Sequence, residues 1–335
     1  MSVTIIDIAR DSNTSKSTVS RYLNGMKVKA NVAKAIEASI ERLDYHPNVN
    51  ARRLVTKKTL TLGVVVEDIS NVYFSDILAG IQEVSGINGY SCTFYSRASN
   101  SASELDFLRL FREGHIDGLI LGTFLKRTKT DVIELAKSGY PIVLIGDSCQ
   151  SNKIDSVDVD NKQGTYDEIE YLYELGHRHI GYLKGPSQMC GANYRYQGFL
   201  EAAERFGLRL ELCIDTGWTV DAGKMATLAL LDKYPEITAV ACSNDHCAYG
   251  AMLACKERGL KVPNDITVVA FDDGPLAKFS TPSITTVKQP FRHLGQMAAR
   301  QLINTIGNST SVRASILLQS QLVVRESSAQ SPRKS

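Results

Sequence analysis

The chain has 335 residues, 43% of them hydrophobic and 22% charged, which excludes a disordered or fibrous protein and allows more than one buried core. It lacks the run of roughly 18 apolar residues that a membrane-spanning helix needs, and Asp7, Arg10 and Asp11 interrupt the N-terminus where a secretory signal would lie. Its seven cysteines are scattered without a CxxC pair, so we expect reduced thiols, no metal site and a cytoplasmic location.

Positive charge is concentrated near the N-terminus. Residues 1–58 contain 11 Lys and Arg against 5 Asp and Glu, whereas residues 59–335 contain 27 against 31. A basic segment on a mildly acidic body indicates that the segment alone meets a polyanion such as nucleic acid. A solvated helical face would produce the same excess, so charge by itself leaves both interpretations open.

Three short helices are predicted in the basic segment from apolar residues at helical spacing. They cover about residues 4–13, 14–23 and 31–43, with Asn31 as the expected cap of the third. A tight polar turn joins the first two, which is typical of a helix-turn-helix whose second helix lies in the major groove of DNA. Val19 and Leu23 would face the first helix and leave the polar side chains of the second directed outward.

The outward side chains of the second helix suit contacts with duplex DNA. Lys16 and Arg21 can donate to guanine N7 and O6. Hydroxyl and amide groups near the helix ends suit phosphates, which set the register without reading the sequence. The DNA-contacting residues expected in this module are Thr4, Ser15, Lys16, Ser17, Ser20, Arg21 and Asn24.

Residues 59 to about 326 alternate short apolar strands with helical stretches. The strand-like runs include LTLGVVV at 60–66, PIVLIG at 141–146 and TVVAFD at 267–272. Continuous apolar strands separated by helices indicate parallel sheets covered on both faces, and their number favours two doubly wound α/β lobes. Ligands of such sheets bind beyond the carboxyl ends of the strands, here in a cleft between the lobes.

Motifs along the whole chain indicate one family. TVSRYLNG at 18–25 and YHPNVNARRL at 45–54 are followed by RYQGF at 195–199, SNDHCAYGAM at 243–252 and VPNDITVVAFDD at 262–273. In these motifs and their order the chain resembles the lactose-repressor/galactose-repressor family of bacterial transcription factors. The resemblance implies a helix-turn-helix head on a body like that of periplasmic sugar-binding proteins.

The resemblance also implies a hinge helix that becomes ordered on the operator. Leu54 corresponds to an apolar wedge in a minor-groove base step, with the small residue Ala51 beside it and Arg52 and Arg53 flanking it. A buried linker leucine is the alternative for Leu54. The DNA-contacting residues expected in the hinge are Asn48, Ala51, Arg52, Arg53 and Leu54.

The family organisation divides the chain into a head, a hinge, two lobes and a tail. The expected segments are a DNA-binding domain at 1–46, a hinge and linker at 47–58, an N-lobe at 59–159 and 289–318, a C-lobe at 160–288 and 319–326, and a disordered tail at 327–335. The chain would therefore cross between the lobes near residues 159, 288 and 318.

The candidate effector-binding residues follow strands or match ligand positions of the family. Arg195 and Asp272 match such positions, and a guanidinium and a carboxylate together can fork the vicinal hydroxyls of a sugar. Trp218 matches an aromatic that stacks on the ligand in relatives, although a lone tryptophan is also often simply buried. The expected set is Tyr73, Phe74, Arg97, Asp147, Arg195, Trp218, Asn244 and Asp272.

Three residues near the expected cleft have open roles. Arg97 follows the second strand, where a second guanidinium facing Arg195 would favour a sugar acid or sugar phosphate. The alternative for Arg97 is a surface arginine. Asp245 and Asp273 either contact the ligand or cap helices.

These features predict a symmetric homodimer that binds a pseudo-palindromic operator of double-stranded DNA and responds to a small carbohydrate effector. The favoured function is repression of a carbohydrate-utilisation operon, and the alternative is a global catabolite regulator that works with a protein corepressor. No cofactor, metal or membrane is expected. No enzyme is expected either, because the sequence has no GxSxG, HExxH or GxxxxGK[ST] motif.

Overall fold

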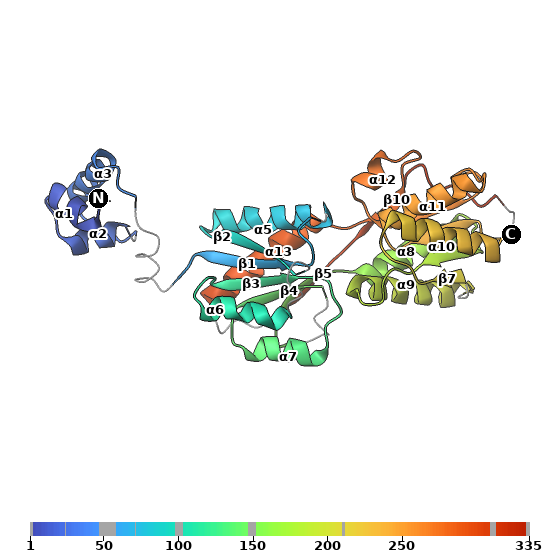
Figure 1. Cartoon of the computed structure of the whole chain (residues 1–335), viewed down its shortest axis with the longest axis horizontal. Coiled ribbons are helices and arrows are strands. Elements are labelled where there is room, and N and C mark those ends of the chain that lie inside the picture. Colours follow the sequence, from blue (N-terminus) through green and yellow to red (C-terminus); the bar gives the residue numbers. More distant parts are fainter. Residues whose placement is uncertain are drawn as a thin grey trace. The chain divides into compact units, whose positions relative to one another are not determined.

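Two compact units make up the chain, Met1–Thr59 and Leu60–Ser335. We call the first unit the head and the second the body (Figure 1). In the computed structural model the described residues are 3–23, 25–46, 58–70, 72–97, 103–146, 152–209, 212–308 and 313–332.

The described residues of the head form three helices around one core. These helices are α1 (Ile5–Asp11), α2 (Lys16–Leu23) and α3 (Ala30–Arg42). Helical spacing of the apolar residues brings Ile8, Val19, Ile36 and Tyr45 together as buried side chains. The predicted pairing of the first two helices is confirmed, because Val19 is buried against residues of α1.

The start of α3 differs from the prediction. The helix begins at Ala30, so Asn31 is its second residue rather than its cap, and Lys29 occupies the capping position. A lysine side chain has no acceptor for the backbone N–H groups of the first turn, and accordingly no side-chain cap forms. The core-facing residues of the helix are unaffected.

The body contains two six-stranded sheets, with the orders β11-β5-β4-β3-β1-β2 and β12-β10-β9-β8-β6-β7. The first sheet, the centre of the N-lobe, consists of β1 (Thr61–Val66), β2 (Ser91–Ser96), β3 (Gly118–Gly122), β4 (Ile142–Ile145), β5 (Asp155–Val159) and β11 (Ser315–Leu318). The second, the centre of the C-lobe, consists of β6 (Ile180–Leu183), β7 (Cys213–Ile214), β8 (Ala239–Cys242), β9 (Thr267–Asp272), β10 (Thr285–Lys288) and β12 (Gln321–Val323). Among the described strands every pairing is parallel except that of β10 with β12.

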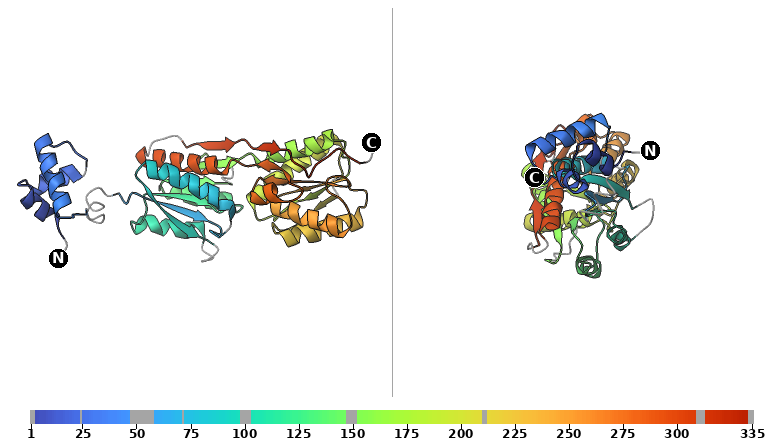
Figure 2. Two further views of the ribbon diagram at one scale, coloured as in Figure 1. Left: turned by 90° about the horizontal axis from the view of Figure 1, so that it is seen from above. Right: turned by 90° about the vertical axis from the view of Figure 1, so that its left-hand side faces the viewer.

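Helices cover both faces of each sheet, as Figure 2 shows. The N-lobe has η1 (Val72–Phe74), α5 (Ser75–Ile87), η2 (Glu104–Leu108), α6 (Arg109–Arg112), α7 (Lys129–Lys137) and α13 (Phe291–Gly307). The C-lobe has α8 (Asn161–Glu174), α9 (Cys190–Phe206), α10 (Val220–Lys233), α11 (Asp245–Glu257) and α12 (Pro275–Phe279). Alternation along β1 shows the layering, since Val64 and Val66 pack with α5 and α13 while Val65 packs with α6 and α7. The predicted pair of doubly wound α/β lobes is confirmed.

The chain passes between the lobes after Val159, after Lys288 and after Leu318. The lobes also contact each other directly, because Leu125 of the N-lobe forms an antiparallel bridge with Met189 of the C-lobe. None of the helices in the described part of the chain has the length and apolar character that a bilayer crossing requires.

The segment after β12 is ordered by hydrogen bonds as far as residue 332, so the prediction of a disordered tail is wrong there. Ser327 is fully buried, and its N–H donates to the carbonyl of Ser283 over 2.9 Å. Further along, the N–H of Ser331 donates to the carbonyl of Leu175 over 2.9 Å. The polar composition that suggested disorder instead supplies hydroxyl and backbone groups that satisfy the edge of the C-lobe.

Candidate functional site

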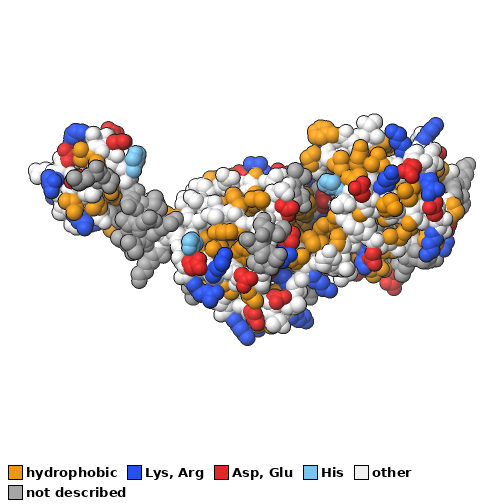
Figure 3. All heavy atoms as spheres, in the orientation of Figure 1, with side chains coloured by type: hydrophobic (Ala, Val, Ile, Leu, Met, Phe, Trp, Pro, Cys, Tyr) orange, Lys and Arg blue, Asp and Glu red, His pale blue; other side chains and the backbone are white. Residues whose placement is uncertain are grey.

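The polar face of α2 is the candidate DNA-binding surface. Lys16, Ser17 and Arg21 are exposed and Ser20 is half-buried, while Val19 between them points into the core. Because residues on the two sides of a helix separate with its period, burial of Val19 directs these donors outward. Figure 3 shows basic side chains on the visible face of the head.

Two of the predicted DNA-contacting residues, Ser15 and Thr4, form hydrogen bonds at the N-termini of α2 and α1. The Ser15 hydroxyl accepts the N–H of Thr18 over 3.1 Å and so caps α2. The N–H and hydroxyl of Thr4 both donate to the carboxylate of Asp7, at 2.9 and 2.7 Å. Thr4 and Ser15 are exposed, so the N-termini of α1 and α2 lie at the surface. Backbone N–H groups at a helix N-terminus favour the binding of anions such as phosphate.

Several predicted residues lie outside the described part of the chain. They are Asn24, Asn48, Ala51, Arg52, Arg53 and Leu54 of the expected DNA interface and Asp147 of the expected effector site. Their proposed roles therefore rest on the sequence alone.

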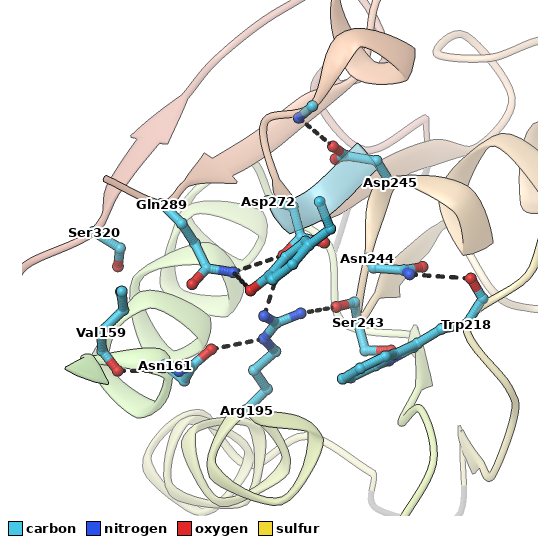
Figure 4. A network of polar contacts seen from close by, with 12 residues as sticks. Val159, Asn161, Arg195, Trp218, Ser243, Asn244, Asp245, Asp272, Gln289 and Ser320 are labelled. Atoms are coloured by element: carbon cyan, nitrogen blue, oxygen red, sulfur yellow. Dashed lines mark hydrogen bonds and ion pairs between the residues drawn. The ribbon is translucent and has the colours of Figure 1, made fainter. Parts of the chain in front are cut away.

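Arg195 is the centre of a buried polar network in the body (Figure 4). It projects from α9 and is only 3% exposed. Its Nε donates to Asn161 Oδ1 over 2.9 Å, and a terminal nitrogen donates to Asp272 Oδ1 over 3.1 Å. Another nitrogen donates to the Ser243 carbonyl, and the guanidinium lies 4.0 Å from the ring centre of Phe271. The resemblance-based prediction that Arg195 and Asp272 lie together agrees with this geometry.

Gln289 extends the network to the other lobe. Its Nε2 donates to Asp272 Oδ1 over 2.7 Å and to the hydroxyl of Tyr73 over 3.3 Å. Gln289 lies on the crossover that follows β10, and Tyr73 lies in η1 of the N-lobe, so the two hydrogen bonds of Gln289 connect Asp272 of the C-lobe with the N-lobe. The sequence prediction did not include Gln289, although its position after a strand in PSITTVKQP was a usable signal.

Trp218 and Asn244 support one another beside Arg195. The indole N–H of Trp218 donates to the Ser243 hydroxyl over 3.2 Å, and its ring lies 5.9 Å from the Arg195 guanidinium. Asn244 caps α11 by accepting the N–H of Cys247 over 2.9 Å, and its amide donates to the Trp218 carbonyl over 3.2 Å. Asn244 therefore helps to position Trp218 through the backbone of Trp218. The amide oxygen of Asn244 is occupied by the hydrogen bond that caps α11.

Tyr73 belongs to an aromatic cluster on the N-lobe side. Its ring centre lies 4.4 Å from that of Phe291 and 5.6 Å from that of Phe124. Burial raises the pKa of Tyr73, so its hydroxyl remains protonated. Phe74 is only 4% exposed and packs in the N-lobe core, where it supports Tyr73. Phe124 was not predicted; it lies after β3 with a backbone φ of +56°, and no pattern in the neighbouring sequence marks it.

Arg97, whose role the sequence left open between a cation facing Arg195 and a surface arginine, forms an ion pair with Glu67. Arg97 donates to both carboxylate oxygens of Glu67, over 2.7 and 2.8 Å. The parallel register that sets Val66 beside Ser96 also sets the next residues, Glu67 and Arg97, side by side. Arg97 lines a hollow of about 180 Å³ in the N-lobe that includes the buried Glu104–Arg127 ion pair.

Asp245 and Asp273, whose roles the sequence left open, both have partners within the C-lobe. Asp245 is buried and accepts from the N–H of Gly274 over 2.6 Å and the hydroxyl of Thr286 over 2.8 Å. Burial and the neighbouring Asp272 raise the pKa of Asp245 to about 8. Asp273 forms ion pairs with Arg325 and, at 3.7 Å, with Lys278.

Comparison with known proteins assigns the family. Residues 4–48 match the family described as bacterial regulatory proteins, lacI family, and residues 169–328 match a periplasmic binding protein-like domain. The chain is 32% identical over 333 residues to catabolite control protein A of Priestia megaterium, which covers 98% of this chain and 99% of that protein. The chain belongs to the lacI family of bacterial regulatory proteins.

Solved structures of lacI-family members are similar over nearly the whole chain. A Lac repressor dimer bound to operator and the anti-inducer ONPF matches with a TM-score of 0.88 and 28% identity, over 98% of this chain and 100% of that one. A complex of the transcriptional regulator CelR with cellobiose matches with a TM-score of 0.72 and 28% identity, over 97% of this chain and 99% of that one.

The described residues of this lacI-family chain show no metal-binding arrangement. They contain no group of three or more His, Cys, Asp or Glu side chains placed to hold a metal ion. The polar network around Arg195 consists instead of one cation, one carboxylate, amides and aromatic faces. These groups suit a ligand held by hydrogen bonds and stacking.

Proposed function

We propose that this lacI-family chain is a cytoplasmic, DNA-binding repressor of a carbohydrate-utilisation operon. It acts as a homodimer on a pseudo-palindromic operator, and a small carbohydrate bound between the lobes controls it. The observation that carries the proposal is the combination in one chain of an exposed basic face on α2 and a buried Arg195–Asp272 pair at the junction of two lobes. The operator-bound Lac repressor dimer and the CelR–cellobiose complex support both halves.

DNA recognition would use α2 for bases and the helix starts for phosphates. Lys16 and Arg21 reach base edges in the major groove, where Arg or Lys pairs with guanine N7 and O6. Asn48, Ala51, Arg52 and Arg53 would contact the minor groove around the wedge Leu54. Neutralisation of phosphates by these cations makes operator binding strongly salt-dependent.

Effector control would act through the network that spans the lobes. A sugar hydroxyl at Asp272 competes for the carboxylate that Gln289 and Arg195 now share. Because Gln289 lies on the crossover and also contacts Tyr73 of the N-lobe, this competition changes the relative stability of the arrangements of the two lobes. A ligand shifts such an equilibrium only by its differential affinity for the two states, typically about 1–3 kcal/mol.

No catalytic activity is assigned. The relative and the solved structures compared above are described as regulatory proteins, and Arg195 and Asp272 bind each other rather than forming a nucleophile with its base. Hydrolysis or phosphorylation of a bound sugar would contradict this assignment.

DNA binding is tested by selecting operators from random inverted repeats with the full chain and measuring affinity by fluorescence anisotropy. Arg21→Ala should weaken binding to the selected operator by about 1–3 kcal/mol, because it removes a base contact. Lys137→Ala removes the same charge from the exposed surface of α7 in the body and should leave the affinity unchanged. Failure of the unmutated chain to enrich any sequence would contradict the proposal.

A global catabolite regulator with a protein corepressor is the second candidate, and the 32% identity to catabolite control protein A supports it. The first turns of α13, where such docking is expected, contain no acidic residue. Operator affinity that responds to a phosphorylated carrier protein and to no sugar would favour this alternative over local control.

A further inference from the structure

We propose that Glu168 is a positioning residue of the effector site, which supports Arg195 from the interior of the C-lobe through bound water shared with Thr165 and Tyr182. The inference rests on the proposed function, because Arg195 is the cation of the proposed effector site. It assigns a role to a buried acid that takes part in none of the hydrogen bonds of Arg195 or Asp272.

Three buried oxygen atoms of the C-lobe have no hydrogen-bond partner among the described residues. They are Thr165 Oγ1, Glu168 Oε1 and Tyr182 Oη. One further atom of this kind, Nδ1 of His179, belongs to the residue that precedes β6. Buried polar groups of folded proteins nearly always bond to the protein or to ordered water. The three oxygens therefore need a polar partner inside the lobe.

These oxygens border one interior space between α8, α9 and β6. Thr165 and Glu168 are three residues apart on α8, so they lie on the same side of that helix. Thr165 faces α9, because a Cβ added to Gly198 would lie 3.2 Å from the Thr165 Cβ. Tyr182 of β6 packs in the core cluster of the same two helices, with its ring centre 4.4 Å from that of Phe199. Burial and then the Glu168 carboxyl raise the pKa of Tyr182, so these two groups lie close enough to interact.

Arg195 adjoins this space and has N–H groups to spare. A guanidinium carries five N–H groups, and the hydrogen bonds of Arg195 within the described residues use three, to Asn161, the Ser243 carbonyl and Asp272 (Figure 4). Burial raises the pKa of Glu168, and the charge of Arg195 opposes that rise, so the two side chains are within electrostatic reach. The ion pair of Arg195 in the described part of the chain is nevertheless with Asp272. A gap between two polar groups of this kind is where an ordered water forms a bridge.

Water matches the hydrogen-bonding capacity of all these groups. An internal water makes about three hydrogen bonds to buried polar atoms, and it both donates and accepts. The hydroxyls of Thr165 and Tyr182 also donate and accept, and a protonated Glu168 donates. Water held by these side chains bonds in turn to an N–H of Arg195, and it thereby restricts the orientation of the guanidinium.

Glu168 acts in this arrangement as a neutral acid. Burial raises its pKa well above the usual value, with Arg195 of α9 opposing the rise and Asp245 of α11 adding to it. The other titratable groups that interact with it are Tyr182 of β6 and Cys242 of β8, and burial raises the pKa of each, so both are uncharged. Because Asp272 already balances Arg195, a neutral donor at Glu168 suffices. The amide of glutamine can therefore replace this acid.

The first test measures stability against pH in the full chain. The pKa of Glu168 is higher in the folded than in the unfolded state, so its contribution to stability is complete below about 4.5 and is lost as the pH rises toward the folded-state value. Glu168→Gln does not titrate. In urea unfolding, the unfolding constant of the original chain divided by that of Glu168→Gln should grow at least about tenfold between pH 5 and 7.5. A ratio that stays constant would overturn the inference, because it would show an ionised Glu168.

The matched control is Glu174→Gln, at the exposed end of the same helix α8. Its unfolding constant, divided into that of the original chain, should give the same ratio at both pH values.

The second test follows Arg195 itself, through its Nε–H resonance in the full chain labelled with ¹⁵N-arginine and assigned with Arg195→Lys. Glu168→Gln should leave the resonance in place, since the amide retains a donor and an acceptor. Glu168→Leu removes both and should shift the resonance by more than its line width. Tyr182→Phe keeps the ring and removes only the hydroxyl, so it should shift the resonance even if Glu168→Leu does not fold. A resonance that Tyr182→Phe and Glu168→Leu leave in place would refute the positioning role.

A crystal structure of the full chain gives the direct observation. We expect ordered water within about 3.2 Å of Glu168 Oε1 that also bonds to Arg195 and to Thr165 or Tyr182. A direct Glu168–Arg195 ion pair would contradict the inference. Operator binding is measured on the same preparations. Failure of these tests with intact operator binding refutes only the role of Glu168, whereas absent operator binding refutes the regulator itself.

Discussion

His177 is a buried histidine that links a strand edge to the tail of the chain. Its Nε2 lies 3.0 Å from the Ala329 carbonyl, which can only accept, so Nε2 carries the proton and Nδ1 accepts from Thr238 at 2.9 Å. Burial lowers the pKa of His177 below its usual 6.5. The folded protein therefore binds this proton less readily than the unfolded chain does.

The contribution of His177 to stability should consequently fall as the pH drops below about 6.5 and level off below its folded-state pKa, because the unfolded chain takes up the proton first. Asp245, with its raised pKa, contributes in the opposite direction. Urea unfolding at pH 7.5 and 5.5 measures this loss in the free energy of unfolding. His177→Gln keeps a donor and an acceptor but does not titrate, so its loss between the two pH values should be smaller. An equal loss in both proteins would show that other groups cause the acid sensitivity.

For single residues, the sequence predicted correctly which side chains come together where a family motif places them in the fold. Arg195 in RYQGF and Asp272 in VVAFDD come together as predicted. The sequence did not predict the partner of Arg97, because Glu67 is placed by strand register rather than by anything near Arg97 in the chain. Gln289 was missed because its role depends on a crossover that brings it to Tyr73.

Among the elements, the contact of α8 with α9 positions the effector site. Gly198 of α9 lies against the backbone of α8, where an added Cβ would clash with the Lys162 carbonyl. Arg195 stands three residues earlier on α9, and its partner Asn161 adjoins Lys162 on α8. The close helix approach therefore sets the distance across which Arg195 reaches Asn161.

Gly198→Ala should push the helices apart, lower the free energy of unfolding by about 1–3 kcal/mol and weaken effector binding. Gly86→Ala is the matched control, since Gly86 lies on α5 with open space around it. There, alanine should leave stability unchanged or raise it by up to about 1 kcal/mol. Thermal unfolding and calorimetry measure both effects, and equal behaviour of the two variants would contradict the packing role of Gly198.

The elements of the body were predictable because apolar strands and helical stretches alternate along it. Buried strands such as β1 read as continuous apolar runs, and the two lobes follow from their number. The tail was mispredicted because its polar composition suggested disorder. In the folded chain, Ser327 and Ser331 form hydrogen bonds with Ser283 and Leu175 of the C-lobe, which are distant in the sequence. The cap of α3 was mispredicted because Asn31 is a better capping residue than Lys29, yet the helix starts one residue earlier.

For the molecule as a whole, control of DNA binding requires that the two lobes can adopt more than one arrangement. Three hydrogen bonds between the lobes would respond to such a change. Gln289 donates to Asp272 over 2.7 Å, the N–H of Cys190 to the Phe124 carbonyl over 3.0 Å, and the N–H of Lys126 to the Gln188 carbonyl over 2.9 Å. A ligand at Asp272 reaches this set through Gln289.

The most direct measurement is the affinity of the full chain for its selected operator at fixed salt, with and without a small carbohydrate that binds the body. We predict that saturating ligand changes the dissociation constant by about 5–150-fold, and that Asp272→Asn retains operator binding but loses this response. An operator affinity that stays the same while the ligand occupies the body would contradict the coupling of the two sites.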